Sequence, residues 1–381
     1  MKRLMQWGLR AITIFDWPLL CLLLLLGTLG LVVMHSAVGS TDWRFADQSR
    51  HFVVAFFVMW IVALVPLPWI IRITPYVYAF SIVLLLGVEF HGEASKGAKR
   101  WLDLGVARIQ PSEMLKITVP LMLAWYFHHY QGAKMKLMDL LIAGVLLAIP
   151  FLLIVRQPDL GTALLVFAVG FSVMYFAGLS FWLLVPVAVV LSVGLGVVLY
   201  YEDTLCAPGF DWVVLHEYQK GRVCTLLNPG MDPLGKGFHT IQSMIAVGSG
   251  GVYGKGYMMG TQTHLDFIPE RTTDFVFAVF AEEFGLYGGI MLLVLYALVI
   301  IRGLSIAAHA NNTFGRLVAG SLAMMMFVYV FVNIGMVTGV LPVVGVPLPF
   351  MSYGGTALLT LGVACGLLMN IYRYKPPSLN P

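Results

Sequence analysis

Residues 160–201 read LGTALLVFAVGFSVMYFAGLSFWLLVPVAVVLSVGLGVVLYY and contain no Asp, Glu, Lys or Arg. A helix that crosses a bilayer needs about 20 predominantly apolar residues, so this stretch is long enough for two helices. The Gly178-Leu179-Ser180 triplet offers a turn between them. We therefore predict that residues 160–201 form two successive membrane-spanning helices.

The rest of the chain extends the same pattern. A second charge-free stretch, 317–372, predicts another pair of spans, divided by the Pro-rich residues 342–349. Hydrophobic residues make up 59% of the chain and charged residues 11%, against roughly 25% charged in soluble domains. The sequence thus predicts an all-α polytopic membrane protein of about ten transmembrane helices. The ten predicted spans are 18–35, 51–66, 73–89, 112–128, 140–155, 160–177, 182–200, 274–301, 317–340 and 351–372.

Charge predicts the orientation of these spans. With the N-terminus in the cytoplasm, the inner segments carry ten cations and only two acids, Asp16 and Asp139. This asymmetry follows the positive-inside rule, so we predict an inner-membrane protein with both termini cytoplasmic and its active face periplasmic. It also accounts for the net charge of +4, without nucleic acid as a partner. The first span has too long an apolar core for a cleavable signal peptide. The ten cations are Lys2, Arg3, Arg10, Arg72, Lys134, Lys136, Arg302, Arg316, Arg373 and Lys375.

We predict a single membrane domain over 1–381, with one large periplasmic loop, 201–273, between the seventh and eighth spans. A loop this long is usually functional. Its Gly-rich stretch 237–256 predicts a re-entrant or interfacial helix. Cys206 and Cys224 both lie in this loop, where an oxidising compartment permits a disulfide. The sequence leaves open whether they pair.

Ionisable side chains at the ends of apolar helices are costly in a membrane and indicate function. The first such group holds Arg100, Trp101, Glu113 and Lys116. Pro111 suits the first position of a helix, and Glu113 could simply complement the helix dipole. Lys116 lies about one turn deeper, at i,i+3 from Glu113, which favours a buried pair lining a cavity. Trp101 suits either an interfacial aromatic belt or a ligand-facing position.

A second group, Arg156, Gln157, Asp159 and Thr162, lies between two charge-free helices. In the simpler interpretation, Asp159 acts only as an N-cap of the following helix. Four polar side chains packed into seven residues also favour ligand binding, and both interpretations stay open.

The long loop supplies a third group: Gln219, Arg222, Gln242, Ser243 and Lys255. Cations beside glycines at a membrane surface suit an anionic head group such as phosphate. A solvated loop face is the ordinary alternative. The glycines around Lys255 resemble a phosphate-binding P-loop only superficially, because no Lys-Ser or Lys-Thr follows them.

Asp274 opens the eighth predicted span. At 100° per residue, Ala278, Ala281, Gly285 and Gly288 share its face. Helices pack closely along stripes of small residues in membranes, so Asp274 is expected to point into the bundle. A partly desolvated acid beside cations suits a general base, and capping of the helix is the alternative. The histidines show no paired-ligand spacing, so no metal site is predicted.

These residues lie in stretches that closely resemble the shape, elongation, division and sporulation (SEDS) proteins. The resemblance extends over nearly the whole chain and favours the rod-elongation members over the division members. The family-wide stretches are KRWLDLGVARIQPSEMLKI (99–117), RQPDLGT (156–162), FIPERTTDFVFAVFAEEFG (267–285) and PLPFMSYGG (347–355). The rod-elongation resemblance rests on the short N-terminus, HEYQKGR (216–222) and NIGMVTGVLPVVGVPLP (333–349).

The resemblance implies a peptidoglycan glycosyltransferase that polymerises lipid II into glycan strands. It also implies a class B penicillin-binding protein (a PBP2-like transpeptidase) and other membrane proteins of the elongation complex as partners. The family's essential acid falls on Asp274, and positions lining its central outer cavity fall on Glu113, Lys116 and Asp159. The segment Cys206–Phe210, with Cys224, departs from the family pattern and leaves the shape of the long loop undefined.

In the resulting hypothesis, Asp274 deprotonates the acceptor sugar 4-hydroxyl, which attacks the donor anomeric carbon with inversion. Arg100, Lys116, Arg222 and Lys255 would stabilise the departing diphosphate. A divalent cation such as Mg²⁺ could assist, although no residue set demands one. The catalytic candidate is Asp274, and the substrate-binding candidates are Arg100, Trp101, Glu113, Lys116, Arg156, Gln157, Asp159, Thr162, Gln219, Arg222, Gln242, Ser243, Lys255 and Ser352.

Two other classes fit the same composition. A flippase or transporter of lipid-linked precursors would also carry intramembrane Glu and Lys, but it predicts polar groups that continue toward the cytoplasm. The polar candidates concentrate on the outer half, which favours chemistry at that surface. A non-catalytic scaffold of the elongation machinery is the third alternative.

Overall fold

The computed structural model describes residues 15–38, 42–95, 98–103, 108–130, 136–180, 182, 184–207, 217–228, 230, 237–265 and 270–374. The contacts of the chain divide it into two compact units. The first takes Met1–Gly178, Leu293–Val330 and Pro349–Pro381, and the second takes Leu179–Leu292 and Phe331–Leu348. The single domain predicted over 1–381 stays a prediction.

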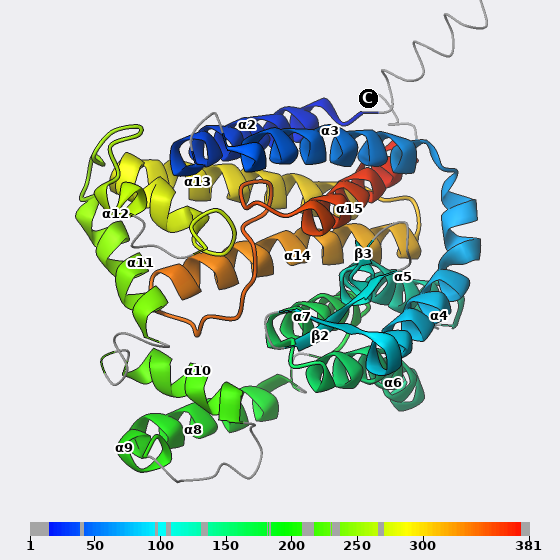
Figure 1. Ribbon diagram of the computed structural model, residues 1–381. Helices are drawn as coiled ribbons and strands as arrows, with labels where there is room; N and C mark the ends of the chain where they lie inside the picture. The colour runs from blue at the N-terminus through cyan, green and yellow to red at the C-terminus, as the bar shows by residue number, and fades with distance from the viewer. Residues whose placement is uncertain are drawn as a thin grey trace, which may run out of the picture. The chain divides into compact units, whose positions relative to one another are not determined.

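Helices form most of the first unit (Figure 1). A small three-stranded antiparallel sheet, in the order β1-β2-β3, follows the third helix. The elements of the first unit are α2 (Trp17–Val38), α3 (Trp43–Leu64), α4 (Leu67–His91), β1 (Glu93–Ser95), β2 (Ala98–Asp103), β3 (Arg108–Ile109), α5 (Pro111–Tyr130), α6 (Leu137–Arg156), α7 (Leu160–Phe176) and α15 (Gly355–Arg373).

The described residues of the second unit form helices joined by turns and loops, with no strand among them. Two further helices, α13 and α14, cross the boundary between the units. The elements are α8 (Leu184–Tyr200), α9 (Glu202–Leu205), α10 (Glu217–Leu227), α11 (Phe238–Ser249), α12 (Thr261–His264), α13 (Val276–Ala308) and α14 (Thr313–Val337).

Every predicted span coincides with a helix. Within the described residues, seven helices are long and apolar enough to cross a membrane: α2, α3, α4, α6, α13, α14 and α15. The remaining three predicted spans are occupied by α5, α7 and α8. The prediction of an all-α polytopic membrane protein is therefore confirmed. The small sheet was not predicted, and it lies in the charged segment that follows α4.

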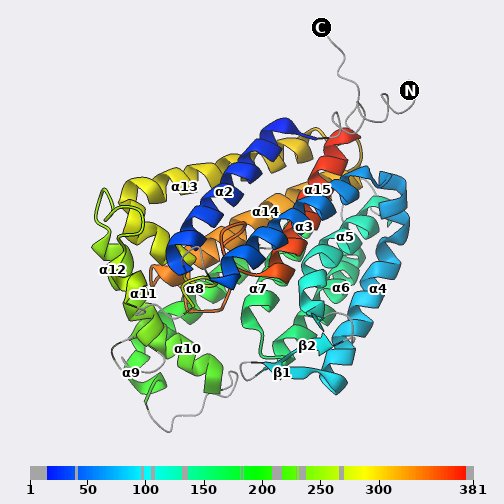
Figure 2. The same cartoon turned by 45° about the horizontal axis from the view of Figure 1, so that its top comes forward.

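Backbone contact between α3 and α15 organises the first unit, and the two helices lie side by side in both views (Figures 1 and 2). A Cβ atom on Gly362 would lie 2.6 Å from the Ala55 carbonyl oxygen, and one on Gly366 would lie 2.7 Å from that of Met59. Only glycine permits this approach, which is how helices pack closely in lipid. The same arrangement places the start of α15 beside the polar start of α3.

The helix α13 is broken at Gly285, where φ is +64°. The backbone amides of Lys255 and Gly256 donate to the carbonyls of Glu282 and Glu283 at 3.0 Å. The amide of Leu286 donates to the Gly251 carbonyl, also at 3.0 Å. The Gly-rich segment after α11 thus replaces hydrogen bonds that the break removes from the helix.

This break corrects one prediction. Ala278 and Ala281 are buried, as expected for a packed face. Extending that face to Gly285 and Gly288 was wrong, because the helical phase is interrupted at Gly285. Sequence periodicity assumes a continuous helix, and the glycine adopts a conformation that L side chains rarely reach.

The long loop has its own structure. It contains α9, α10, α11 and α12, and the predicted helix within 237–256 is α11. A disulfide joins Cys206 to Cys224, which answers the question that the sequence left open. It ties α10 to the end of α9, where Lys220 Nζ also donates to the Ala207 carbonyl at 3.3 Å.

Candidate active site

A buried ion pair lies near the start of α5. Lys116 is 1% exposed, and its Nζ lies 2.5 Å from Glu113 Oε1. The same Nζ donates to the Tyr329 hydroxyl at 2.7 Å. The i,i+3 spacing places both charged side chains on one face of the helix. The predicted buried pair is therefore present, and its ammonium is held by two partners.

A second polar group surrounds Asp159, at the start of α7. Its Oδ1 accepts a hydrogen bond from the Thr162 amide at 3.3 Å, so it caps the helix as the simpler interpretation required. Its Oδ2 accepts from Gln110 Nε2 at 3.3 Å and lies 3.8 Å from Arg100 Nε. Arg100 also donates to the Pro158 carbonyl at 2.7 Å. Asp159 is thus both a cap and the centre of a polar cluster.

The two polar groups are connected through the start of α5. The Glu113 amide donates to the Gln110 carbonyl at 3.0 Å, and Gln110 also contacts Asp159. The first unit therefore brings together Arg100, Asp159, Glu113 and Lys116, which the sequence places in two separate groups.

Other candidates in this unit are placed differently. Gln157 is buried and donates to the Leu85 carbonyl at 3.1 Å, so it fastens α4. Thr162 is buried in the first turn of α7, and Arg156 is exposed at the end of α6. Trp101 is half-buried on β2, opposite Glu93 of β1.

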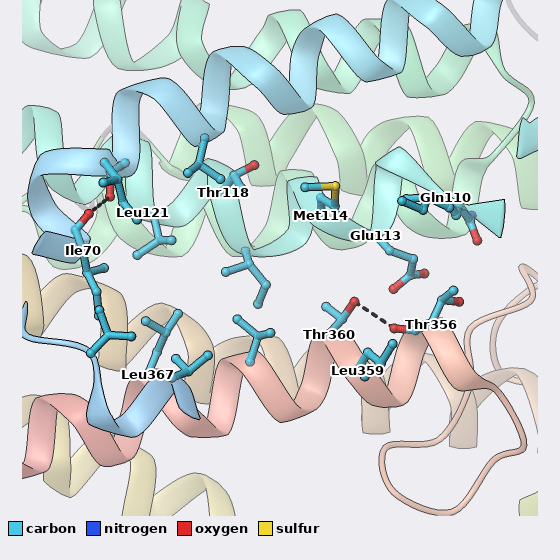
Figure 3. A pocket seen from close by; sticks show the side chains of 18 of the residues that line it. Ile70, Gln110, Glu113, Met114, Thr118, Leu121, Thr356, Leu359, Thr360 and Leu367 are labelled. Atoms are coloured by element: carbon cyan, nitrogen blue, oxygen red, sulfur yellow. Dashed lines mark hydrogen bonds between the residues drawn. The ribbon is translucent and has the colours of Figure 1, made fainter. Parts of the chain in front are cut away.

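A cavity of about 600 Å³ opens among α3, α4, α5 and α15. The surface of the cavity is almost entirely apolar, and Glu113 lies toward one end of it (Figure 3). The Glu113 carboxyl group is directed toward Thr356 and Thr360 of α15. Glu113 Oε2 and Thr118 Oγ1, although buried, have no hydrogen-bond partner within the described structure. The cavity thus combines a long apolar wall with unsatisfied polar oxygens, the composition of a ligand site.

Asp274 lies in a turn, two residues before α13 begins. The turn starts at Glu270, whose φ is +54°, and the Thr273 and Phe275 amides donate to its carbonyl. Asp274 itself is half-buried, whereas Phe275 is 2% exposed and stacks on His239. The preceding stretch 266–269, part of the FIPERTTDF sequence, lies outside the described residues.

The long-loop candidates serve several contacts within the second unit. Ser243 is fully buried and donates to the Val337 carbonyl at 3.0 Å, so it fastens α11 to α14. Lys255 Nζ lies 2.7 Å from Glu282 Oε1. Gln242 and Arg222 are half-buried on α11 and α10. The side chain of Gln219 in α10 is outside those that the structure describes.

Glu282 is the buried partner of Lys255. Its side chain is fully buried and accepts from the Gln262 amide at 2.9 Å and from Thr263 Oγ1 at 3.1 Å. Thr261 Oγ1 also donates to it, at 3.2 Å. This carboxylate therefore binds α12 and the Lys255 segment to the broken part of α13.

Ser352 lies in the segment before α15, which α3 holds in the first unit. Its carbonyl accepts from Gln48 Nε2 at 3.0 Å, and the neighbouring Tyr353 hydroxyl donates to Asp47 Oδ2 at 2.8 Å. Burial and this hydrogen bond raise the pKa of Tyr353 to about 12. Gln48 and Asp47 were missed because they look like an ordinary polar helix start.

Two further residues, Tyr329 and Asn333, were not predicted from the sequence. Tyr329 carries no signal, because a tyrosine in an apolar span is usually core. Asn333 does carry one, since a lone amide in an apolar span needs hydrogen-bond partners. Among the residues that the structure describes, no group of three or more His, Cys, Asp or Glu is placed to hold a metal ion.

Buried charge clusters at the ends of apolar helices define this chain as a polytopic membrane protein of the enzyme or transporter type. The chain belongs to the FtsW/RodA/SpoVE family of cell cycle proteins, whose model matches residues 16–376. This confirms the resemblance drawn from the motifs.

Two of the relatives are both peptidoglycan glycosyltransferases by name. The chain is 47% identical over 360 residues to the peptidoglycan glycosyltransferase MrdB of Escherichia coli K12, covering 94% of both chains. It is 32% identical over 428 residues to the peptidoglycan glycosyltransferase RodA of Treponema pallidum, covering 95% of this chain and 98% of the relative.

Solved structures show the same fold. A chain of a peptidoglycan synthase complex that coordinates polymerization and crosslinking matches with a TM-score of 0.78 and 28% identity, over 94% of this chain and 98% of that one. The rod shape determining protein RodA of Thermus thermophilus matches with a TM-score of 0.68 and 26% identity, over 96% and 98% of the two chains.

Proposed function

We propose that this protein is a peptidoglycan glycosyltransferase that polymerises lipid II into glycan strands for cell-wall elongation and rod shape. The single observation that carries the proposal is the placement of Asp274. Its carboxylate lies on a structured turn at the start of an apolar helix, in a chain that is 47% identical to MrdB. A positioned acid of this kind is what removal of a proton from a sugar hydroxyl requires.

In the proposed reaction, Asp274 accepts the proton of the acceptor 4-hydroxyl as that oxygen attacks the donor anomeric carbon. The new bond joins the acceptor oxygen to the anomeric carbon, with inversion at that carbon. The bond from the anomeric carbon to the diphosphate oxygen breaks, and its electron pair leaves with the diphosphate. Cations near the leaving group would stabilise its negative charge.

The described contacts rank the candidate cations. Arg100 is 30% exposed in its side chain and is held in place by Pro158 and Asp159, so it is ordered yet accessible. Lys116 is buried and paired with Glu113, and Lys255 is paired with Glu282. We therefore propose Arg100 as a contact for a diphosphate, and the role predicted for Arg222 stays a prediction. Direct roles for Lys116 and Lys255 require that their present partners release them.

The cavity beside Glu113 supports a lipid-linked substrate. Its volume of about 600 Å³ and its aliphatic wall suit a hydrocarbon chain, and the carboxyl group marks a polar end. A bulky Val363→Trp substitution would fill this space from α15 and is expected to raise the KM for lipid II about fivefold or more. Val83→Trp is the matched control, because Val83 lies on α4 and is 62% exposed. It is expected to leave the KM unchanged.

Orientation and partners follow from the same proposal. The Cys206–Cys224 disulfide supports a periplasmic long loop, because disulfides persist in oxidising compartments. We propose an inner-membrane protein with both termini cytoplasmic and its active face periplasmic. The similarity to a chain of a synthase complex with crosslinking activity supports a class B penicillin-binding protein as partner. The other elongation-complex proteins stay a prediction.

The decisive experiment incubates purified protein with fluorescent lipid II and resolves the products on a gel. The wild type is expected to form long glycan, and Asp274→Asn is expected to lose at least about 10²-fold in rate while retaining its melting temperature. Polymerisation by folded Asp274→Asn at the wild-type rate would contradict the proposed role. A wild type that moves lipid II across vesicle membranes without polymerising it would instead indicate a flippase.

A further inference from the structure

A single buried amide joins two segments that the sequence keeps apart. Asn333, in α14, is fully buried. Its Nδ2 donates to the Asp274 carbonyl at 2.9 Å and to the Val346 carbonyl at 2.7 Å. One side chain therefore connects the turn before α13 with the segment after α14, and all three residues belong to the second unit.

The hydrogen bond from Asn333 holds the backbone just before the start of α13. The Ala278 amide donates to the Phe275 carbonyl at 2.9 Å, in the tighter three-residue pattern. Asp274 lies one residue earlier, and its carbonyl accepts from Asn333. The asparagine thus restrains the backbone of the residue that carries the proposed general base.

Burying the Asn333 amide is unfavourable, so good packing alone does not explain an asparagine at this position. Asn333 Oδ1 is buried and has no hydrogen-bond partner within the described residues. A buried oxygen without a hydrogen-bond partner destabilises the folded state. An aliphatic side chain would avoid that cost in an apolar span, so the two donated hydrogen bonds are the feature that the amide uniquely supplies.

The second connected segment also touches the carboxylate. A Cβ atom on Gly345 would lie 3.4 Å from Asp274 Oδ2, and Gly345 has a φ of +73°. The carboxylate therefore lies close to Gly345, the residue next to Val346. The amide fixes both sides of this contact, the backbone of Asp274 and the segment against which its side chain rests.

We propose that Asn333 is a positioning residue for Asp274, acting as a bracket that holds the carboxylate against the Gly345–Val346 segment. The inference rests on the proposed function, because it assigns a role relative to the general base. A misplacement of about 1 Å at a reacting group can cost about 10²-fold in rate. The bracket is therefore expected to affect turnover more than substrate affinity.

The test measures lipid II polymerisation by purified, reconstituted protein, with kcat and KM determined separately and rates normalised to folded protein. Asn333→Leu keeps the branching and the number of heavy atoms of the side chain and removes both N–H donors. It is expected to lower kcat about tenfold or more, with KM within about twofold of the wild type. Asn333→Asp places oxygens against two carbonyls and is expected to lower kcat at least as far.

A second pair of variants leaves Asn333 untouched. Gly345→Ala adds a methyl group beside the carboxylate and is expected to lower kcat in the same way. Gly339→Ala is the matched control, because its φ of +75° imposes a similar backbone strain. Its added Cβ would meet only the end of Met244, 2.5 Å from Sδ, a flexible side chain. Its kcat is expected to stay within about twofold of the wild type.

The outcomes separate this inference from the proposed function. Full activity of Asn333→Leu beside an inactive Asp274→Asn overturns the bracket and leaves the general base in place. An active Asp274→Asn overturns the proposed function. If Asn333→Leu does not fold, the two glycine variants decide: equal kcat for Gly345→Ala and Gly339→Ala overturns the inference, and a selective loss in Gly345→Ala supports it.

Discussion

The Lys116–Glu113 pair offers the sharpest test of the described structure. Replacing Lys116 with Met retains an unbranched chain of similar length but leaves the Glu113 carboxylate buried without its cation. At 2.5 Å and an effective dielectric of about 20, the direct attraction is about 6–7 kcal/mol. Removing one partner of a buried pair costs about 3–5 kcal/mol after relaxation. We expect about 3 kcal/mol, the lower end of this range, because Glu113 is 11% exposed in its side chain.

The measurement is the thermal unfolding midpoint of purified protein in detergent. About 2 °C per kcal/mol gives a midpoint about 6 °C lower for Lys116→Met. The Lys116→Met/Glu113→Gln double variant has no unpaired charge and is expected within about 2 °C of the wild type. Lys136→Met, which removes an exposed lysine at the start of α6, controls for the loss of positive charge and is expected to change the midpoint by less than about 1 °C.

The double variant gives the refuting result. If Lys116→Met and Glu113→Gln lower the midpoint independently and their effects add in the double variant, the two side chains are not coupled. A wild-type midpoint for Lys116→Met would equally contradict the reasoning, because no desolvated carboxylate would have lost its partner.

Three further predictions follow from other contacts. Lys255→Met should lower the midpoint by several degrees and expose its loop to protease, because the fully buried Glu282 loses its cation. Reductant should lower the midpoint of the wild type, because opening the Cys206–Cys224 link, which spans 18 residues, removes about 3 kcal/mol of stabilisation. The pKa of Tyr353 is raised to about 12, so its stabilisation is complete below about pH 10 and is lost as the pH rises toward 12. Tyr353→Phe should therefore flatten the fall of the midpoint over that alkaline range.

Each of these has its own control. Lys255→Arg keeps the charge and should retain protease resistance, so equal cleavage of both variants would contradict the ion pair. Reductant should leave a Cys206→Ser/Cys224→Ser variant unchanged, and an equal shift in both proteins would exclude the disulfide as the cause. An alkaline profile for Tyr353→Phe that overlays the wild type would show that the phenol does not titrate in the proposed way.

Much of the fold was readable from composition and charge. The charge-free stretch 160–201 predicted two helices, and α7 and α8 occupy it, separated near Gly178. The chain has no other way to satisfy its backbone in lipid than to form helices or a closed barrel. The i,i+3 spacing of Glu113 and Lys116 also predicted a buried pair, because helical geometry is local.

The site was only partly readable. Asp274 stood out as an acid at the mouth of an apolar span, but the turn that precedes α13 and the break at Gly285 did not. A prediction from periodicity continues a helix through a glycine unless another signal ends it. The break at Gly285 depends on hydrogen bonds from the Gly-rich segment, which lies about 30 residues away in the sequence. Lys255 was predicted to bind an anionic head group. In the structure it pairs instead with the buried carboxylate of Glu282, which is also about 30 residues away in the sequence.

By itself, the sequence determined which segments enter the membrane and which polar side chains lie at their ends, because lipid solvation and helix geometry act on neighbouring residues. Tertiary structure decided which of those side chains meet. Tyr329 reaches Lys116, and Asn333 reaches Asp274 and Val346, across separations that no local pattern records. A hydrogen bond or ion pair depends on the distance between two atoms to within a few tenths of an ångström. Only packing sets that distance, so the partner of each charge could not be predicted from the sequence.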